Sequence, residues 1–93
     1  MSLTTSTAFD ASTHWELSSH VSLRDEEFGA LAYHHVNRRL VFLKSRDLVN
    51  LVRRLGEFAS AREALDALIK AGERDRYLTA LSSLATSELL HGD

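Results

Sequence analysis

The chain has 93 residues, which fits a single domain, and it contains neither cysteine nor proline. The lack of cysteine excludes disulfide bonds and thiolate metal sites, and it suits the reducing cytoplasm, where we place the protein. The formal net charge of −2 argues against general affinity for nucleic acid. No apolar run approaches the ~20 residues of a membrane span, so we expect no membrane insertion.

The N-terminal part predicts a disordered lead followed by extended segments. Residues 1–13 have neither a basic start nor an apolar run, so we expect them to be disordered and the domain to occupy residues 14–91. Loose alternation in His14–Leu23 predicts an extended segment with a short strand near Val21. The charged residues Arg24–Glu27 predict a turn.

A hairpin is predicted over Phe28–Lys44. Its first strand covers Phe28–His35, and its second covers Arg38–Lys44. The turn is expected at Val36-Asn37, because asparagine tolerates a left-handed backbone. Since no further strand follows, the second strand should lie at an edge of the sheet, with unpaired backbone N–H and C=O groups.

Both faces of this edge strand are apolar, although a strand with one wet face should alternate apolar and polar residues. Leu40 and Phe42 point to one face, and Val41 and Leu43 point to the other. Helices can cover one of the two faces. For the other face there are three alternatives: the segment around Trp15, a second copy of the chain, or another protein.

The second half of the chain predicts three helices. Ser45 is a suitable N-cap for a first helix, which Gly56 ends. Ser60–Glu63 matches the S-x-x-E capping box of a second helix, and Gly72 stands where a left-handed C-terminal residue is wanted. A third helix is expected from Asp75 to Leu89. The predicted fold is therefore α+β, a three-stranded antiparallel sheet followed by three helices.

Candidate catalytic and metal sites are weak. His34 and His35 are adjacent on a predicted strand, so their side chains point to opposite faces and cannot hold one ion together. The other histidines lack metal-ligand spacing. No glycine-rich phosphate loop and no G-x-S-x-G motif occurs. We expect no catalysis, no metal and no cofactor in this chain.

The basic residues cluster around the predicted edge strand. Between Arg38 and Arg54 there are six basic residues and one acid, Asp47. The cluster is either a solvated surface patch or a surface that faces an acidic partner.

Three functional classes fit three strands and three helices. A winged helix that binds DNA should present Arg, Lys, Asn or Gln along its recognition helix, but here only Arg74 and Arg76 occur there, both at its start. A structural subunit would use the apolar strand to form a homodimer through the sheet. Peptide binding fits best, because an exposed edge strand accepts an extended peptide as an added strand.

Three motifs, in their order and spacing, resemble a known family. They are FGALAY (Phe28–Tyr33), LVFLKSR (Leu40–Arg46) and YLTALSSLA (Tyr77–Ala85). The resemblance runs from Trp15 to Leu90. The family is that of the mycofactocin precursor-peptide-binding chaperones, which are small relatives of the PqqD-like recognition elements of ribosomally made, modified peptides (RiPP recognition elements).

The resemblance implies a non-catalytic peptide chaperone with a winged-helix-like fold. Its partner would be a short acidic precursor peptide, bound between the third strand and the third helix. The chaperone would present this peptide to a radical S-adenosylmethionine (radical SAM) maturase, which would hold the iron–sulfur cluster. The peptide-binding residues that we expect are a backbone ladder (Arg39, Leu40, Val41, Phe42, Leu43), flanking charges (Arg38, Lys44, Arg46), a helix wall (Tyr77, Leu81, Leu84) and two cations for carboxylates (Arg74, Arg76).

Overall fold

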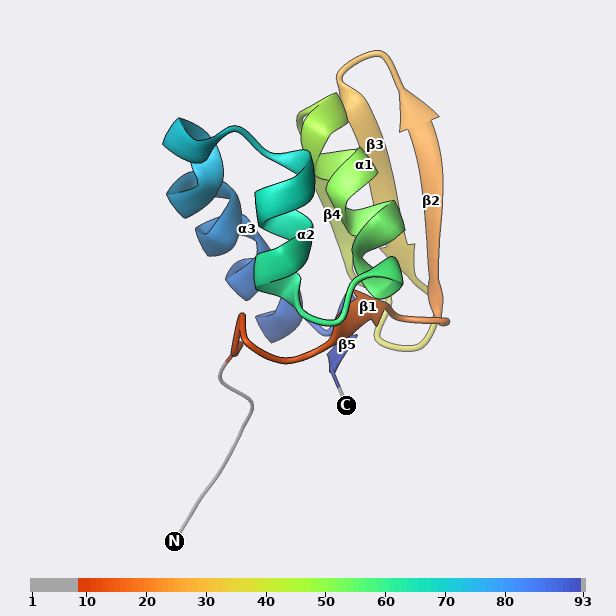
Figure 1. Cartoon of the computed structure of the whole chain (residues 1–93). Helices are drawn as coiled ribbons and strands as arrows, with labels where there is room; N and C mark the ends of the chain where they lie inside the picture. The colour runs from red at the N-terminus through yellow and green to blue at the C-terminus, as the bar shows by residue number, and fades with distance from the viewer. Residues whose placement is uncertain (1–8, 93) are drawn as a thin grey trace, which may run out of the picture.

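The computed structural model describes residues 9–92, which form a small sheet packed against three helices (Figure 1). The helices and strands follow the order that the sequence predicts, with an additional short strand near each end. They are β1 (Trp15–Leu17), β2 (Val21–Glu26), β3 (Gly29–His34), β4 (Leu40–Leu43), α1 (Arg46–Arg54), η1 (Leu55–Glu57), α2 (Ala61–Leu68), η2 (Ala71–Glu73), α3 (Arg74–Thr86) and β5 (Leu90–Gly92), where η marks a 3-10 helix.

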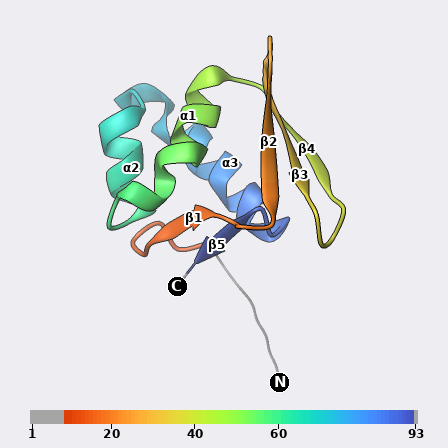
Figure 2. The same cartoon turned by 90° about the vertical axis from the view of Figure 1, so that its right-hand side faces the viewer.

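The main sheet is antiparallel with the strand order β2-β3-β4, so β4 lies at an edge as predicted. Figure 2 shows the three strands on one side of the molecule and the helices on the other. The predicted fold class, a three-stranded antiparallel sheet followed by three helices, is confirmed. The helices cover only one face of the main sheet.

The core lies between the inner face of the sheet and the helices. Ala30 and Ala32 of β3 are fully buried, and their small side chains let α1 lie close to the sheet. Leu51 of α1 and Leu81 of α3 are also fully buried. Burying a leucine side chain stabilises the fold by roughly 1.5–3 kcal/mol, so such residues supply much of the driving force.

A second sheet, which the sequence analysis did not predict, joins the two ends of the domain. β1 pairs with β5 in antiparallel register, with Trp15 opposite Gly92. The Trp15 side chain is buried, and a Cβ at Gly92 would lie only 3.0 Å from its ring. Trp15 thus packs at the base of the helices. The alternative that its segment covers the outer face of the main sheet is wrong.

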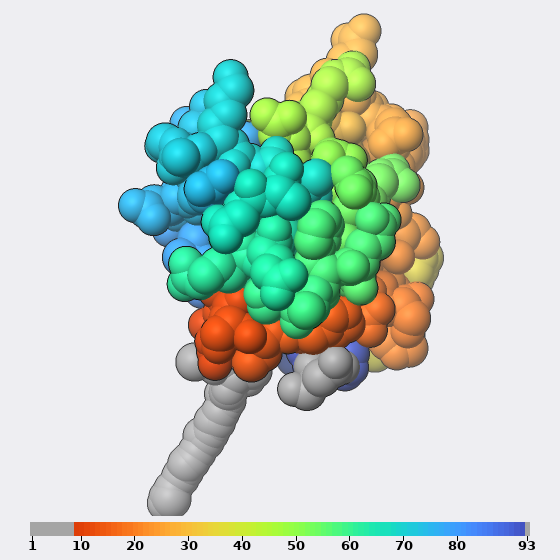
Figure 3. All heavy atoms as spheres, viewed as in Figure 1, coloured from red at the N-terminus to blue at the C-terminus, as the bar shows by residue number. Residues whose placement is uncertain are grey.

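The N-terminal lead behaves differently from the prediction in the part that the structure describes. Residues 1–8 lie outside the described residues, whereas residues 9–13 pack on the domain and run along the base of α2 in Figure 3. The carbonyls of Ala11 and Thr13 accept hydrogen bonds from Arg62 and Ala61 in the first turn of α2. Residues 11 and 13 therefore contact the domain that was expected to start at residue 14.

The segment that was predicted as a charged turn is a strand. β2 continues through Glu26, and the turn lies at residues 27–28. Gly29 follows with φ 147°, and a Cβ there would collide with the Leu43 carbonyl oxygen, so only glycine fits. Ion pairs offset the charges within β2: Arg24 pairs with Glu26, and Asp25 pairs with Arg53 of α1, both at 2.9 Å.

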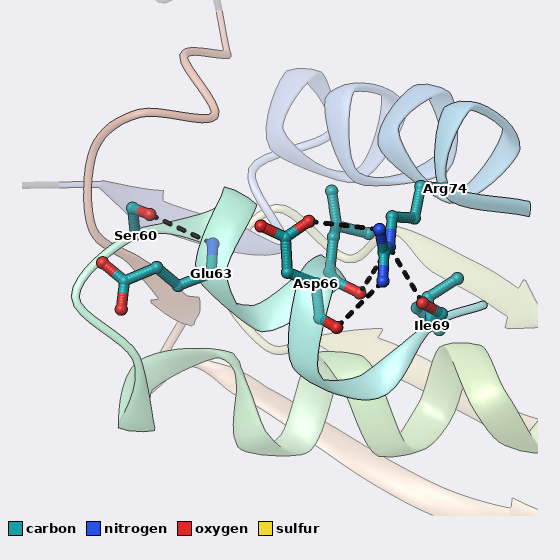
Figure 4. A network of polar contacts seen from close by, with 6 residues as sticks. Ser60, Glu63, Asp66, Ile69 and Arg74 are labelled. Carbon is teal, nitrogen blue, oxygen red and sulfur yellow. Dashed lines mark hydrogen bonds and ion pairs between the residues drawn. The ribbon is translucent and has the colours of Figure 1, made fainter. Parts of the chain in front are cut away.

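The helix starts match the sequence prediction, but two helix ends do not. The Ser45 hydroxyl accepts a hydrogen bond from the Leu48 N–H at 2.9 Å. Likewise, the Ser60 hydroxyl accepts one from the Glu63 N–H at 3.1 Å (Figure 4). Gly72 is not a left-handed cap, because α2 already ends at Leu68 and Gly72 lies within η2.

The third helix is shorter than predicted at its C-terminal end. It starts at Arg74 and ends at Thr86, whereas the prediction extended it to Leu89. Glu88 adopts a left-handed backbone with φ 66°, which turns the chain out of the helix. Leu89 and Leu90 are buried, but they lie in the turn after α3 and in β5 and not on the apolar face of the helix.

Candidate functional site

The candidate site is the free backbone edge of β4. The His34 N–H donates to the Arg39 carbonyl at 2.9 Å. Because hydrogen-bonded positions alternate in an antiparallel pair, the backbone groups of Val41 and Leu43 also point toward β3. The N–H and C=O groups of Leu40 and Phe42 therefore point away from β3. Within residues 9–92 these groups make no other backbone hydrogen bond. They can pair with an added strand.

The turn before β4 is built around a buried histidine. The Nδ1 atom of His34 accepts hydrogen bonds from the N–H groups of Val36 and Asn37, each at 3.1 Å. The left-handed residue of the turn is Arg38, with φ 65°, so the prediction that Asn37 takes this conformation is wrong. Instead, the Asn37 side chain accepts a hydrogen bond from the Arg39 N–H at 2.9 Å.

Hydrogen bonds at both ends of β4 hold this strand beside α3. Before β4, the Asn37 side-chain amide donates to the Ser87 carbonyl and the Glu88 carboxylate, both at 3.4 Å. After β4, the Ser45 hydroxyl lies 3.0 Å from the Tyr77 hydroxyl, in the first turns of α3. The edge of β4 therefore runs antiparallel to α3.

The two faces of β4 differ sharply in exposure. Leu43 is 1% exposed and Val41 is partly buried, and both face the helices. Leu40 is 56% exposed and Phe42 is 54% exposed, and the Phe42 ring lies 5.7 Å from the exposed ring of Phe28. The helices thus cover the face of Val41 and Leu43, and the uncovered face is that of Leu40 and Phe42.

The predicted basic cluster divides into two groups. On α1, Arg53 pairs with Asp25, while Arg54 pairs with Glu57 at 3.2 Å. In the part of the chain that the structure describes, the remaining cations have exposed side chains and form no ion pair; these are Arg38, Arg39, Lys44 and Arg46. Free positive charge therefore flanks β4 at both of its ends.

Arg46 differs from the other three cations in its surroundings. It lines a hollow of about 540 Å³ between α1 and the β2–β3 turn, together with Asp25, Glu26 and Glu27. These nearby carboxylates offset part of its positive potential. The other cations that flank β4 do not line this hollow; these are Arg38, Arg39 and Lys44.

The expected helix wall lies in the core. Tyr77 is 7% exposed, and Leu81 and Leu84 are likewise buried. Leu81 and Leu84 hold α3 in place, and the Tyr77 hydroxyl reaches Ser45 at the end of β4. These three residues position the edge.

The two arginines at the start of α3 have different roles. The Arg74 guanidinium donates hydrogen bonds to three backbone carbonyls at the end of α2 (Figure 4). The distances are 3.3 Å to Leu65, 3.0 Å to Asp66 and 2.9 Å to Ile69. It also lies 3.6 Å from the Asp66 carboxylate. Arg74 therefore caps α2 and compensates for the missing glycine cap.

Arg76 keeps an exposed side chain. Its guanidinium lies 3.4 Å from the Glu73 carboxylate and 5.7 Å above the Tyr77 ring. Arg76 therefore lies over the Tyr77 ring and, unlike Arg74, is not used to cap α2.

His34 and His35 point to opposite faces of the sheet as predicted, since His34 is buried and His35 is exposed, whereas the rings of His20 and His34 lie 5.8 Å apart. His34 bonds to its own turn, and the His35 ring lies 2.6 Å from the Ser22 hydroxyl. Among residues 9–92, no group of three or more His, Cys, Asp or Glu side chains is arranged to hold a metal ion. No helix in the same range is long and apolar enough to cross a bilayer.

Comparison with known proteins points to one family. The profile of the peptide chaperone MftB family matches residues 14–91. Peptide chaperone MftB of Mycobacterium ulcerans is 43% identical over 84 residues, which cover 89% of this chain and 77% of the relative. The proteins of the same name from Mycobacterium tuberculosis and Mycolicibacterium smegmatis are 41% and 42% identical, over 91% and 88% of this chain and 79% and 81% of the relatives. No solved structure matches the chain.

Proposed function

Because this chain belongs to the peptide chaperone MftB family, we propose that it binds the acidic leader of a ribosomally made precursor peptide, the mycofactocin precursor. The leader adds to β4 as a further strand, and the chaperone presents the peptide to a radical SAM maturase. The observation that carries the proposal is the open backbone of Leu40 and Phe42, flanked by free cations.

The backbone of β4 supplies the general affinity. Leu40 and Phe42 offer two N–H and two C=O groups to an added strand, and each hydrogen bond contributes about 1 kcal/mol net. A disordered peptide loses conformational freedom on binding, which offsets part of this gain. Hydrogen bonds alone would therefore give weak binding with little selectivity, and side chains must add both.

The cations supply the selectivity for acidic strands. If β4 of two copies paired antiparallel around Val41, Arg38 of one copy would oppose Lys44 of the other. Directly opposed like charges destabilise a strand pair. An acidic peptide meets the same cations favourably. The edge therefore favours an acidic peptide over self-pairing, which argues against a homodimer that extends the sheet through β4.

The role of the chain in maturation is to hold the peptide near the enzyme. Joining leader and maturase in one complex raises the effective concentration of the reacting part of the peptide without new chemistry. A chain without cysteine cannot supply the thiolates that hold an iron–sulfur cluster, so the radical chemistry belongs to the maturase. The same absence of cysteine suits the reducing cytoplasm.

DNA binding is the weaker alternative. Only two cations stand at the start of α3, and Arg74 is used to cap α2. Phosphate contacts from the remaining cations would position a duplex without reading its sequence.

The test is a calorimetric titration of the protein with a synthetic acidic leader peptide. A scrambled peptide of equal length and charge is the matched control. We expect saturable binding of the leader and at least tenfold weaker binding of the scrambled peptide. Equal affinity for both peptides would reduce the site to a general basic surface, and binding of neither would refute leader recognition by this chain.

A further inference from the structure

A second surface of the same sheet remains uncovered, and it is apolar along β3 and β4. We define the outer apolar face as the apolar side chains of β3 and β4 that project away from the helices, together with the residue at the β2–β3 turn: Phe28, Leu31, Tyr33, Leu40 and Phe42. On the same side β2 presents polar side chains, which border this face: Ser22, Arg24 and Glu26. The register places Leu31 opposite Phe42 and Tyr33 opposite Leu40, so these four share one face.

The exposure of this face is high for a small domain. Phe28 is 43% exposed, Leu40 is 56% exposed and Phe42 is 54% exposed. The only other large hydrophobic residue with comparable exposure within residues 9–92 is Val36, in the β3–β4 turn. No element of the described chain lies over the outer face, because all helices are on the opposite side of the main sheet (Figure 2). Contiguous exposed apolar side chains of this kind mark interaction sites.

The outer apolar face is continuous with the peptide-binding edge. Leu40 and Phe42 send their backbone groups to the edge and their side chains to the outer face. A peptide strand that pairs with them extends the same sheet, so its alternate side chains project on the same side as Leu40 and Phe42. A protein that lies on this face therefore contacts the chaperone and the bound peptide together.

The size of the face argues against a permanent dimer. The apolar face spans β3 and β4, which lie about 4.8 Å apart and are four to six residues long, so its area is roughly 130–200 Å². Stable interfaces bury about 800 Å² per partner. A bound peptide strand enlarges this two-stranded face by roughly one half on the same spacing. The loaded sheet is thus a better docking surface than the empty one.

We propose that the outer apolar face is where the maturase docks, and that the bound peptide completes the docking surface. This inference rests on the proposed function and adds the surface and the order of assembly. The maturase would present an apolar patch, and it would bind the peptide-loaded chaperone more tightly than the empty chaperone. Such coupling would deliver the enzyme preferentially to chaperones that carry substrate.

The test uses substitutions on the outer face that lie away from the β4 edge. The double variant Phe28→Ser with Leu31→Thr removes apolar surface from the turn and the central strand, neither of which contacts the added peptide. Val36→Ser is the matched control, since Val36 is 67% exposed and lies outside the face. If the double variant does not fold by circular dichroism, the single change Phe28→Ser replaces it. Two affinities are measured by calorimetry: leader peptide to chaperone, and maturase to chaperone with and without saturating peptide.

We expect the outer-face variant to bind the leader within twofold of the parent and the maturase at least tenfold more weakly. Peptide should strengthen maturase binding to the parent at least fivefold. Unchanged maturase affinity in the variant, or an equal loss in Val36→Ser, would refute the docking surface while leaving leader binding intact. A parent that scatters light as a dimer, and a variant that scatters as a monomer, would assign the face to a second copy instead. Failure of the parent to bind leader would show instead that the proposed function is wrong.

Discussion

The main sheet has two open edges, and they differ in charge rather than in backbone geometry. At the β2 edge the carboxylates are compensated, because Arg24 pairs with Glu26 and Arg53 pairs with Asp25. At the β4 edge, the flanking cations Arg38, Arg39 and Lys44 form no ion pair within residues 9–92.

The backbone geometry of the two edges is equivalent. The His35 N–H donates to the His20 carbonyl at 2.8 Å, so the alternation along β2 leaves the groups of Leu23 and Asp25 pointing away from β3. These groups correspond to those of Leu40 and Phe42 on β4. An open edge by itself therefore does not identify a binding site. The uncompensated charge beside one edge selects which strand can join it.

The largest expected effect comes from removing a backbone donor at one edge or the other. In Phe42→Pro the outward N–H is lost and the proline ring occupies the path of the added strand, while the bonds from β4 to β3 remain. We expect leader affinity to fall at least about thirtyfold, or about 2 kcal/mol. The control Asp25→Pro makes the same change at the β2 edge and should leave the affinity within twofold.

Calorimetry measures both affinities after circular dichroism has established that each variant is folded. An equal loss in the two variants, or no loss in Phe42→Pro, would mean that the peptide does not pair with β4.

The next effect concerns Arg74, which belongs to neither edge. Arg74→Gln removes the charged donor from the end of α2 and leaves its carbonyls with fewer partners. We expect the free energy of unfolding to fall by about 1–2 kcal/mol, because hydrogen bonds to charged groups exceed ordinary ones. Urea titration measures this loss. Leader affinity should not change. A large decrease in leader affinity with unchanged stability would show that Arg74 takes part in peptide binding.

The charges at the β4 edge should act through long-range attraction. The double change Arg38→Ala with Arg39→Ala should weaken leader binding about tenfold at low salt and about twofold at high salt, because salt screens exposed charges. Calorimetry at two ionic strengths checks this. An equal loss at both ionic strengths would indicate contacts other than electrostatic attraction.

The smallest effect is expected at the compensated edge. Arg53→Ala breaks the exposed pair with Asp25, and such surface pairs contribute about 0–1 kcal/mol. Leader affinity should stay the same or increase, because the Arg53–Asp25 pair lies at the β2 edge, away from the proposed peptide site at β4. Weaker binding by more than threefold would show that the β2 edge takes part, and it would remove the contrast between the edges.

The sequence predicted the parts of the fold that local patterns determine. The β4 strand, its edge position and the N-caps Ser45 and Ser60 follow from a short apolar run, element order and capping chemistry. The pairing of β1 with β5 was missed because these two three-residue strands lie at opposite ends of the chain. The extension of β2 was missed because its partner Arg53 comes from α1, far along the sequence.

The candidate site was predicted in outline but not in its supporting contacts. The cations near β4 could be read from the sequence, but which of them are compensated depends on the fold. Arg74 gave no local sign that it caps α2, because its acceptor carbonyls belong to the preceding helix. His34 was considered only as a metal ligand, although a histidine just before a tight turn is suitably placed to accept from the turn amides.

The comparison of the two edges is tested most directly by amide hydrogen exchange of the protein with and without the acidic leader peptide. Leu40 and Phe42 donate their N–H groups to the added strand in this account, and Leu23 and Asp25 are the corresponding residues at the other edge. The account predicts that saturating peptide slows exchange at Leu40 and Phe42 at least tenfold and leaves Leu23 and Asp25 unchanged. Protection of the β2 amides, or binding without protection at β4, would contradict it.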